Sequence, residues 1–236
     1  NKVDLICAIA TPAAQTVANV TSDIPIVATA VTDYKTAKLV KDDAKPGTNV
    51  TGTTDMNPVA EQLDLLLKLV PNAKTIGTIY CSSEVNSQLQ VELLKKAAAA
   101  KGITVKEATV STVNDIQQAA RSLAGDVQAV YVPTDNVLAS AIPTLISVTE
   151  EAKLPVICAE GGMVRAGGLA TLGVDYYKLG FQTGVMAADI LSGKSKPADM
   201  AIQAQKEFKP TINLKEAAKI GLKVPEDLLK GAEVIK

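Results

Sequence analysis

Short apolar runs alternate with longer amphipathic stretches along the whole chain, and this alternation constrains the fold more than any other feature. The short runs are apolar throughout, as in residues 24–31 and 75–81. A strand that is apolar on both faces is typical of a parallel sheet covered by helices on either side. The alternation therefore predicts an α/β protein built from doubly wound parallel sheets.

The positions of the expected elements follow from the same pattern. Strands are expected at residues 3–10, 24–31, 49–53, 75–81, 103–110, 129–132, 156–159, 169–174 and 208–212. Helices are expected at residues 13–20, 35–41, 58–70, 84–101, 115–124, 137–152, 179–191 and 214–220. Thr11 is a natural N-cap with Pro12 at the first helical position, and Ser83 is the expected cap of its helix. About nine strands in 236 residues divide more naturally into two lobes than into one sheet.

Polar residues follow the predicted strands, where ligands of doubly wound sheets bind. These loops are residues 11–15, 32–34, 54–57, 82–87, 133–136, 160–162 and 175–177. Hydroxyl groups and helix N-termini can hold a carboxylate, and an Asp or Glu can hold an ammonium group. Each loop alone is equally typical of an ordinary helix cap. Taken together, the loops suit a small zwitterionic ligand.

An enzyme is disfavoured by what the sequence lacks. The chain has no histidine, which excludes Ser-His-Asp and Cys-His catalysis and any His-ligated metal site. The glycine pairs at 161–162 and 167–168 do not form a dinucleotide or phosphate-binding fingerprint. We therefore expect no catalytic residue, no metal and no cofactor, although Ser-Lys or Asp-Lys chemistry is left open.

The amino-acid composition disfavours several classes of partner. The 24 basic residues are balanced by 25 acidic ones, so no surplus of positive charge favours nucleic acid. Tryptophan is absent and aromatic residues total 3%, which disfavours a sugar site built from stacked indoles. The sequence has no run of 18 apolar residues, so it predicts no membrane span. Cys7, Cys81 and Cys158 all lie in or beside apolar runs and are expected to be buried, reduced thiols.

Several segments match those of a known family. In chain order they read VDLI, AIATPAAQ, AVTD, PGTNVTG, SEVNS, YVPTDN, EGGM and GVDYYKLG. With these segments, spread over nearly the whole chain, the sequence resembles the ABC-transporter substrate-binding proteins of the aromatic amino-acid group, which includes tryptophan- and tyrosine-binding lipoproteins.

The resemblance implies a type I periplasmic-binding fold, in which two lobes are joined by three crossing segments and close on a ligand. Lobe one is expected to comprise residues 1–55 and 177–203, and lobe two residues 56–176 and 204–236. Members of the family begin with a lipid-modified cysteine and about two further strands and helices. The first strands of lobe one are therefore expected to be missing from this sequence.

The resemblance also implies ligand contacts. Lobe one would contribute Thr11, the N–H groups of Ala13 and Ala14, and Thr32. Lobe two would contribute Asn86, Ser87, Thr134, Asp135, Asn136 and Glu160, and a crossing would contribute Asp175 and Tyr176. Asp135 or Asp175 is expected to hold the ammonium group, and Thr11 with its helix N-terminus the carboxylate. For Asp175 and Tyr176 the alternative is a hinge that never meets the ligand.

The function implied is that of an extracytoplasmic, lipid-anchored binding protein that is not an enzyme. It would capture a small amino-acid-like ligand, with an aromatic amino acid as the first expectation, and deliver it to the membrane permease of an ABC importer. We expect a monomer. The alternative is a ligand-sensing module of a signalling receptor or transcription regulator with the same fold. A third possibility is an enzyme of the doubly wound class.

Overall fold

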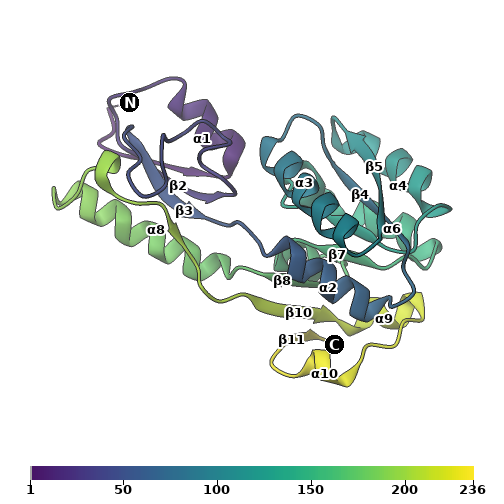
Figure 1. The fold of residues 1–236 in the computed structure, drawn as a ribbon. Coiled ribbons are helices and arrows are strands. Elements are labelled where there is room, and N and C mark those ends of the chain that lie inside the picture. The colour runs from purple at the N-terminus through teal and green to yellow at the C-terminus, as the bar shows by residue number, and fades with distance from the viewer. Residues whose placement is uncertain (1) are drawn as a thin grey trace. The chain divides into compact units, whose positions relative to one another are not determined.

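The computed structural model describes residues 2–236, which divide into two compact units (Figure 1). Unit 1 consists of the residues up to Met56 together with Val174–Glu207, and unit 2 of Asn57–Gly173 and Phe208–Lys236. The chain therefore passes between the units three times. The lobe boundaries drawn from the sequence, after residues 55, 176 and 203, stay a prediction of which segments would move together.

Unit 1 is built on a four-stranded parallel sheet in the order β1-β2-β3-β9. Its elements are β1 (Ile6–Ile9), α1 (Thr11–Ala18), β2 (Ile26–Val31), β3 (Val50–Thr54), α8 (Tyr176–Leu191), a 3₁₀ turn (Pro197–Asp199) and β9 (Gln203–Ala204). Ala28 of β2 packs with Ala14 of α1, whereas Val27 packs with Met186 of α8. Because neighbouring residues of a strand face opposite sides, the two helices cover opposite faces of this sheet.

Unit 2 is built on a seven-stranded sheet in the order β11-β10-β8-β7-β6-β4-β5. Its strands are β4 (Thr75–Cys81), β5 (Thr104–Val110), β6 (Val130–Val132), β7 (Val156–Cys158), β8 (Ala170–Gly173), β10 (Lys209–Asn213) and β11 (Glu233–Ile235). Its helices are α2 (Val59–Leu69), α3 (Val85–Ala100), η1 (Val113–Asp115), α4 (Ile116–Ala124), α5 (Asn136–Ser140), α6 (Ile142–Glu151), α7 (Gly161–Arg165), α9 (Leu214–Ile220) and α10 (Glu226–Leu229). The expected parallel pairing holds from β5 to β8, but β10 runs antiparallel to β8.

Helices cover both faces of the unit 2 sheet. One apolar cluster joins α2, α3 and α9 to Tyr131, and a second joins α4, α6 and α7 to Val130 and Val132 on the opposite face. Buried apolar area of this kind stabilises a fold by about 25 cal/mol per Å². The α/β class expected from the sequence is confirmed, with two units whose sheets are parallel except where β10 joins β8.

Two helix predictions are wrong. Residues 35–41 form turns, because Lys38 has a φ of +59°, which an α-helix does not allow. The single helix expected at 137–152 is two helices, α5 and α6, which meet at Ala141. Pro143 lies at the start of α6, where its missing N–H costs nothing, and it would break a helix continued from α5.

Other differences concern helix ends and short elements. Thr11 is the first residue of α1 and Ala10 is its N-cap, while Glu84 replaces Ser83 as the cap of α3. The elements α7, α10, β9 and β11 were not expected. Each has five residues or fewer, which is too short for a periodic pattern.

Some apolar groups of unit 1 lie on the surface. Cys7 is exposed, contrary to expectation, whereas Cys81 and Cys158 are buried. On α8, Tyr177 is 84% exposed and Phe181 is 70% exposed. The side of α8 that meets the sheet is thus only a narrow stripe of the helix, formed by Leu179, Thr183, Met186 and Ala187.

Tyr34 and Gly52 fit together inside unit 1. The Tyr34 hydroxyl lies 2.9 Å from the carbonyl oxygen of Ala28 and 3.0 Å from that of Thr53. Gly52 has a φ of +151°, and a Cβ there would lie 1.8 Å from the Ala28 oxygen and 2.5 Å from the Tyr34 hydroxyl. A side chain at residue 52 would therefore break this contact between β2, β3 and the segment after β2.

We expect Gly52→Ala to lower the free energy of unfolding by more than about 3 kcal/mol, through strain and loss of the Tyr34 contact. The matched control is Gly184→Ala on α8, where a Cβ meets nothing within 4 Å. It should raise stability by about 0.5–1 kcal/mol, because alanine favours a helix. Urea-induced unfolding measures both changes, and equal midpoints for the two variants would contradict this account.

Lys219 of α9 pairs with Glu150 of α6, beside the buried carboxyl group of Glu216. Lys219 lies 2.6 Å from the Glu150 carboxylate and 3.7 Å from that of Glu216. Burial, followed by the neighbouring Glu150 carboxylate, raises the pKa of Glu216 to about 7. Between pH 4.5 and about 7 the folded chain holds a proton on Glu216 that the unfolded chain releases, so folding favours the protonated form.

The stability of the protein should consequently fall as the pH rises from 4.5, the ordinary pKa of a glutamate, to about 7. Glu216→Gln should remove this fall, a difference of about 1–3 kcal/mol between the two proteins at pH 7 relative to pH 4.5. Thermal or urea unfolding across this pH range measures it. Glu226→Gln, at an exposed position on α10, is the control and should keep the wild-type profile.

Candidate functional site

Each unit gathers polar side chains at the carboxyl ends of its parallel strands. In unit 1 they come from α1, from the residues after β2 and β3, and from the start of α8. In unit 2 they come from the residues after β4, β6 and β7. This is the edge at which doubly wound sheets bind ligands.

Four residues form a hydrogen-bonded chain in unit 1. The Thr32 hydroxyl donates to Asp55 Oδ1 at 3.0 Å, and the Tyr176 hydroxyl donates to Asp55 Oδ2 at 2.7 Å. The backbone N–H of Thr32 lies 3.4 Å from the Thr11 hydroxyl. The side chains of Asp55, Thr11 and Thr32 are buried. The structure thus brings the predicted Thr11, Thr32 and Tyr176 together around Asp55, a residue missing from the predicted contacts.

The start of α1 is strained. Its N-cap, Ala10, has a φ of +75° and a ψ of 156°, a conformation that alanine rarely adopts. Ala30, near the end of β2, also has a positive φ, of +54°. Such strain tends to be kept where the backbone is held for function. Ala13 is exposed, but the N–H of Ala14 already donates to the carbonyl of Ala10.

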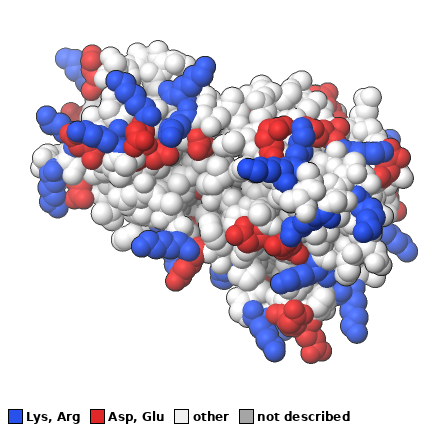
Figure 2. Space-filling view, in the orientation of Figure 1, with Lys and Arg blue, Asp and Glu red and all other residues white. Residues whose placement is uncertain are grey.

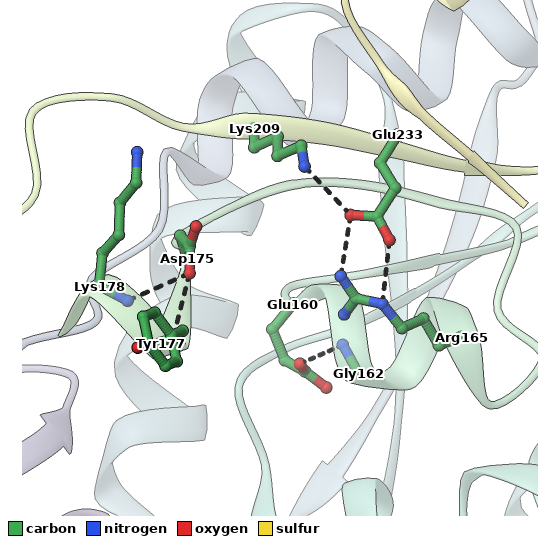
Figure 3. Close-up of polar contacts among 8 residues, drawn as sticks. All are labelled: Glu160, Gly162, Arg165, Asp175, Tyr177, Lys178, Lys209 and Glu233. Atoms are coloured by element: carbon green, nitrogen blue, oxygen red, sulfur yellow. Dashed lines mark hydrogen bonds and ion pairs between the residues drawn. The ribbon is translucent and has the colours of Figure 1, made fainter. Parts of the chain in front are cut away.

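Asp175 caps α8. Its Oδ1 accepts hydrogen bonds from the N–H groups of Tyr177 and Lys178 (Figure 3). Its backbone N–H and carbonyl are both bound by the side chain of Gln205. The carboxylate stabilises the helix N-terminus, and its role as an ammonium partner stays a prediction.

Asp135 is the central carboxylate of the unit 2 cluster. Its Oδ2 accepts hydrogen bonds from the Cys81 N–H and the Ser87 hydroxyl, both at 2.7 Å, and its Oδ1 accepts one from the Leu138 N–H at 2.9 Å. Burial, and then the nearby Glu84 carboxylate, raises the pKa of Asp135. Asp135 therefore fastens the end of β4 to α3 and caps α5, which leaves little capacity for a ligand.

Glu84 is a second buried carboxylate beside it. It accepts hydrogen bonds from the N–H groups of Asn136 and Val137 and from the Asn136 side-chain amide, at 2.6 Å for the last. The Asn86 side-chain amide also donates to it, at 2.9 Å. Glu84 thus orients two of the predicted ligand contacts, Asn86 and Asn136.

Thr134 connects the remaining members. Its N–H donates to Gln90 Oε1 at 2.7 Å, and its hydroxyl lies 3.0 Å from Gln90 Nε2 and 3.3 Å from Asn57 Nδ2. Its carbonyl accepts hydrogen bonds from both Asn86 and Ser87. The predicted residues after β4 and β6 therefore form one continuous network.

Glu160 follows β7, and the hydrogen bonds of its carboxylate are local. Its carboxylate accepts hydrogen bonds from the N–H groups of Gly162 and Met163 and so caps α7 (Figure 3). A Cβ on Gly162 would lie 2.8 Å from that carboxylate, so a side chain there would displace it. The role of Glu160 in ligand binding stays a prediction.

Ion pairs fix α7 to the last strands of unit 2. The Arg165 guanidinium donates to both oxygens of Glu233, at 3.1 and 2.9 Å, and Lys209 lies 3.4 Å from the same carboxylate (Figure 3). Paired contacts of this kind give geometric specificity as well as energy. The tail of the chain thus supports the segment that carries Glu160.

The predicted contacts left out four polar residues of these networks, namely Glu84, Asp55, Asn57 and Gln90. Glu84, Asp55 and Asn57 stand in the loops that follow predicted strands, so their position was an available signal. Gln90 lies inside α3, one turn after Asn86, and nothing in its local sequence marks it.

Figure 2 shows basic and acidic side chains mixed over the visible face of both units. Residues 2–236 hold no group of three His, Cys, Asp or Glu side chains placed to bind a metal ion. Within the same residues, no helix has both the length and the apolar character needed to cross a membrane.

Two α/β units with polar groups at the carboxyl ends of their strands are typical of binding proteins of the periplasmic type. Residues 1–236 match the family described as ABC transporter substrate binding protein, and the chain belongs to that family. Its fold is the type I periplasmic-binding fold.

Characterised relatives and solved structures resemble the chain closely. The Tyrosine-binding protein of Clostridioides difficile (strain R20291) is 47% identical over 195 residues, which are 83% of this chain and 56% of that protein. The chain thus spans little more than half of that relative's length. The ABC domain from Streptococcus pneumonia in complex with L-Trp is 42% identical, with a TM-score of 0.96, covering 100% of this chain and 80% of that one.

A third relative was solved without ligand. It is the ligand-free, open structure of a substrate binding protein with adhesive properties from Clostridium difficile. It is 43% identical, with a TM-score of 0.73, and the match covers 99% of this chain and 78% of that one.

Asp135→Asn should lower the free energy of unfolding of the ligand-free protein by about 2 kcal/mol, because an amide cannot accept hydrogen bonds at both ends and would leave a buried N–H unpaired. Asp175→Asn is the matched control. Only Oδ1 of Asp175 accepts the two capping bonds, so asparagine can replace it at a cost below about 1 kcal/mol. Thermal unfolding without ligand measures both; similar losses would contradict the central role of Asp135.

Proposed function

We propose that the protein captures an aromatic amino acid and delivers it to an ABC importer without chemical change. The observation that carries the proposal is the pair of buried polar networks at the carboxyl edges of both sheets. A relative of 42% identity was solved with L-Trp, and another of 47% identity is a tyrosine-binding protein. The protein would act outside the cytoplasm as a monomeric lipoprotein, with the permease of the importer as its partner.

Unit 1 is suited to the carboxylate of the ligand. Thr11 and Thr32 place hydroxyl and N–H groups beside the N-terminus of α1, whose helix dipole favours negative charge. Ala13 is the exposed residue of its first turn. Asp55 and Tyr176 hold Thr32 in place through the chain of hydrogen bonds.

Unit 2 is suited to the ammonium group and the remainder of the ligand. The residues after β4 and β6 present amide and hydroxyl groups beside two buried carboxylates, Glu84 and Asp135. Asn86, Ser87, Thr134 and Asn136 are the proposed contacts there, with Glu160 as a further one. Asp135 or Asp175 is the proposed source of negative charge for the ammonium group.

The sensory alternative shares the fold but predicts a different partner. A binding module of a receptor or regulator would bind its ligand equally well and would not stimulate a transporter. Reconstituted permease and ATPase, assayed for ligand-dependent ATP hydrolysis with and without this protein, separates the two functions.

We expect calorimetry with the wild-type protein to detect binding of L-Trp or L-Tyr and no binding of glucose or galactose. The physical reason is that the polar networks match a zwitterion, while the chain has few aromatic side chains to stack on a sugar. Binding of a sugar or nucleoside with no binding of any amino acid would refute the proposed ligand class.

Thr11→Ala should weaken amino-acid binding by about tenfold, as expected for one hydrogen bond to a charged group. The matched control is Thr16→Ala on the same helix, whose exposed hydroxyl donates to the Pro12 carbonyl. That variant should bind like the wild type. Equal affinity of the two variants would remove Thr11 from the site.

A further inference from the structure

Both hydrogens of the Asn86 side-chain amide are hydrogen-bonded. Nδ2 lies 2.8 Å from the Thr134 carbonyl oxygen and 2.9 Å from Glu84 Oε2, and it also lies 3.3 Å from the Ser87 hydroxyl. An amide NH₂ has two hydrogens, which the two shorter contacts occupy. The amide oxygen, Oδ1, is buried and accepts no hydrogen bond from the described residues.

The direction of this amide is fixed by its neighbours. Turning it over would place Oδ1 against the Glu84 carboxylate and the Thr134 carbonyl, both of which only accept hydrogen bonds. Glu84 cannot move away freely, because the N–H groups of Asn136 and Val137 hold its carboxylate. The orientation of Asn86 Oδ1 therefore follows from Glu84.

A buried acceptor without a donor is unfavourable, and native proteins rarely keep one without a reason. Asn86 is 4% exposed and stands at the first turn of α3, directly beyond the carboxyl end of β4. The carboxylates of Glu84 and Asp135 belong to the same network and give it a negative potential. A positively charged donor suits this position best.

We propose that Asn86 Oδ1 accepts a hydrogen bond from the ammonium group of the amino-acid ligand, and that Glu84 is the positioning residue that aims it. This inference rests on the proposed function and names the group that recognises the ligand's amine. Asp135, whose carboxylate already accepts three hydrogen bonds, then contributes charge without direct contact. The site selects for a free amine, and ligands lacking one are bound weakly.

A double-mutant cycle between protein and ligand tests the assignment. Calorimetry gives the affinities of wild type and Asn86→Ala for L-Trp and for indole-3-propionate, which lacks the amine. The wild type should bind indole-3-propionate about 10- to 100-fold more weakly than L-Trp. For Asn86→Ala the ratio of the two affinities should be at least several-fold smaller. L-Tyr and 3-(4-hydroxyphenyl)propionate form a second pair of probes.

Glu84→Gln is the second variant, and it also serves if Asn86→Ala does not fold. It should weaken L-Trp binding about tenfold while leaving indole-3-propionate nearly unchanged, because the misdirected amide loses only the amine contact. Gln88→Ala is the matched control: Gln88 is an exposed amide on the same helix that donates to the Ser82 carbonyl. Its four affinities should equal those of the wild type.

Two results would overturn the inference in distinguishable ways. In the first, the wild type binds L-Trp, but removing the amine weakens binding to Asn86→Ala and Glu84→Gln as much as to the wild type. This result contradicts the role of Asn86 and leaves the proposed function standing. A wild-type protein that binds no amino acid contradicts the proposed function as well. Thermal midpoints without ligand show that the variants compared are folded.

Discussion

The burial of two carboxylates side by side is the constraint on which the unit 2 edge depends. Asp135 and Glu84 can remain there only because backbone N–H groups, a hydroxyl and two amides surround them with donors. Satisfying those charges determines where β4 ends, how α3 and α5 begin and which way Asn86 and Asn136 point. Local helix capping and ligand recognition are thus one arrangement, since the residues that cap helices also orient the polar groups beside them.

The regular parts of the fold could be predicted from the sequence because burial leaves a periodic pattern. The strand at 75–81 and the helix at 214–220 have the bounds expected of them. The predictions failed where a tertiary contact overrides local preference, as at residues 35–41, where Tyr34 fastens the segment to β2 and β3. Antiparallel β10 was unpredictable for another reason: the direction of an added strand depends on the path of the chain and not on its composition.

The candidate site was predictable in kind and less so in detail. Loops after strands indicated hydroxyls and amides, and most of the named residues lie in two networks. The loops could not show which carboxylate is free of internal hydrogen bonds and able to bind an ammonium group. Asp135 looked like an ammonium partner because two of its three donors, Cys81 and Ser87, lie 54 and 48 residues away in the sequence. Asp55 escaped notice because its partners, Thr32 and Tyr176, come from segments 23 and 121 residues away.

The three crossings between the units have a consequence for synthesis. Unit 1 begins before unit 2 but receives α8, the cover of one face of its sheet, only after Gly173 has been added. Synthesis adds about 5–20 residues per second, so the residues between Met56 and Val174 take on the order of ten seconds to make. Throughout that interval Val27 has no Met186 to pack against. The nascent chain therefore carries an uncovered apolar sheet face while its second unit is still being made, which is the period in which a chaperone would be of most use to it.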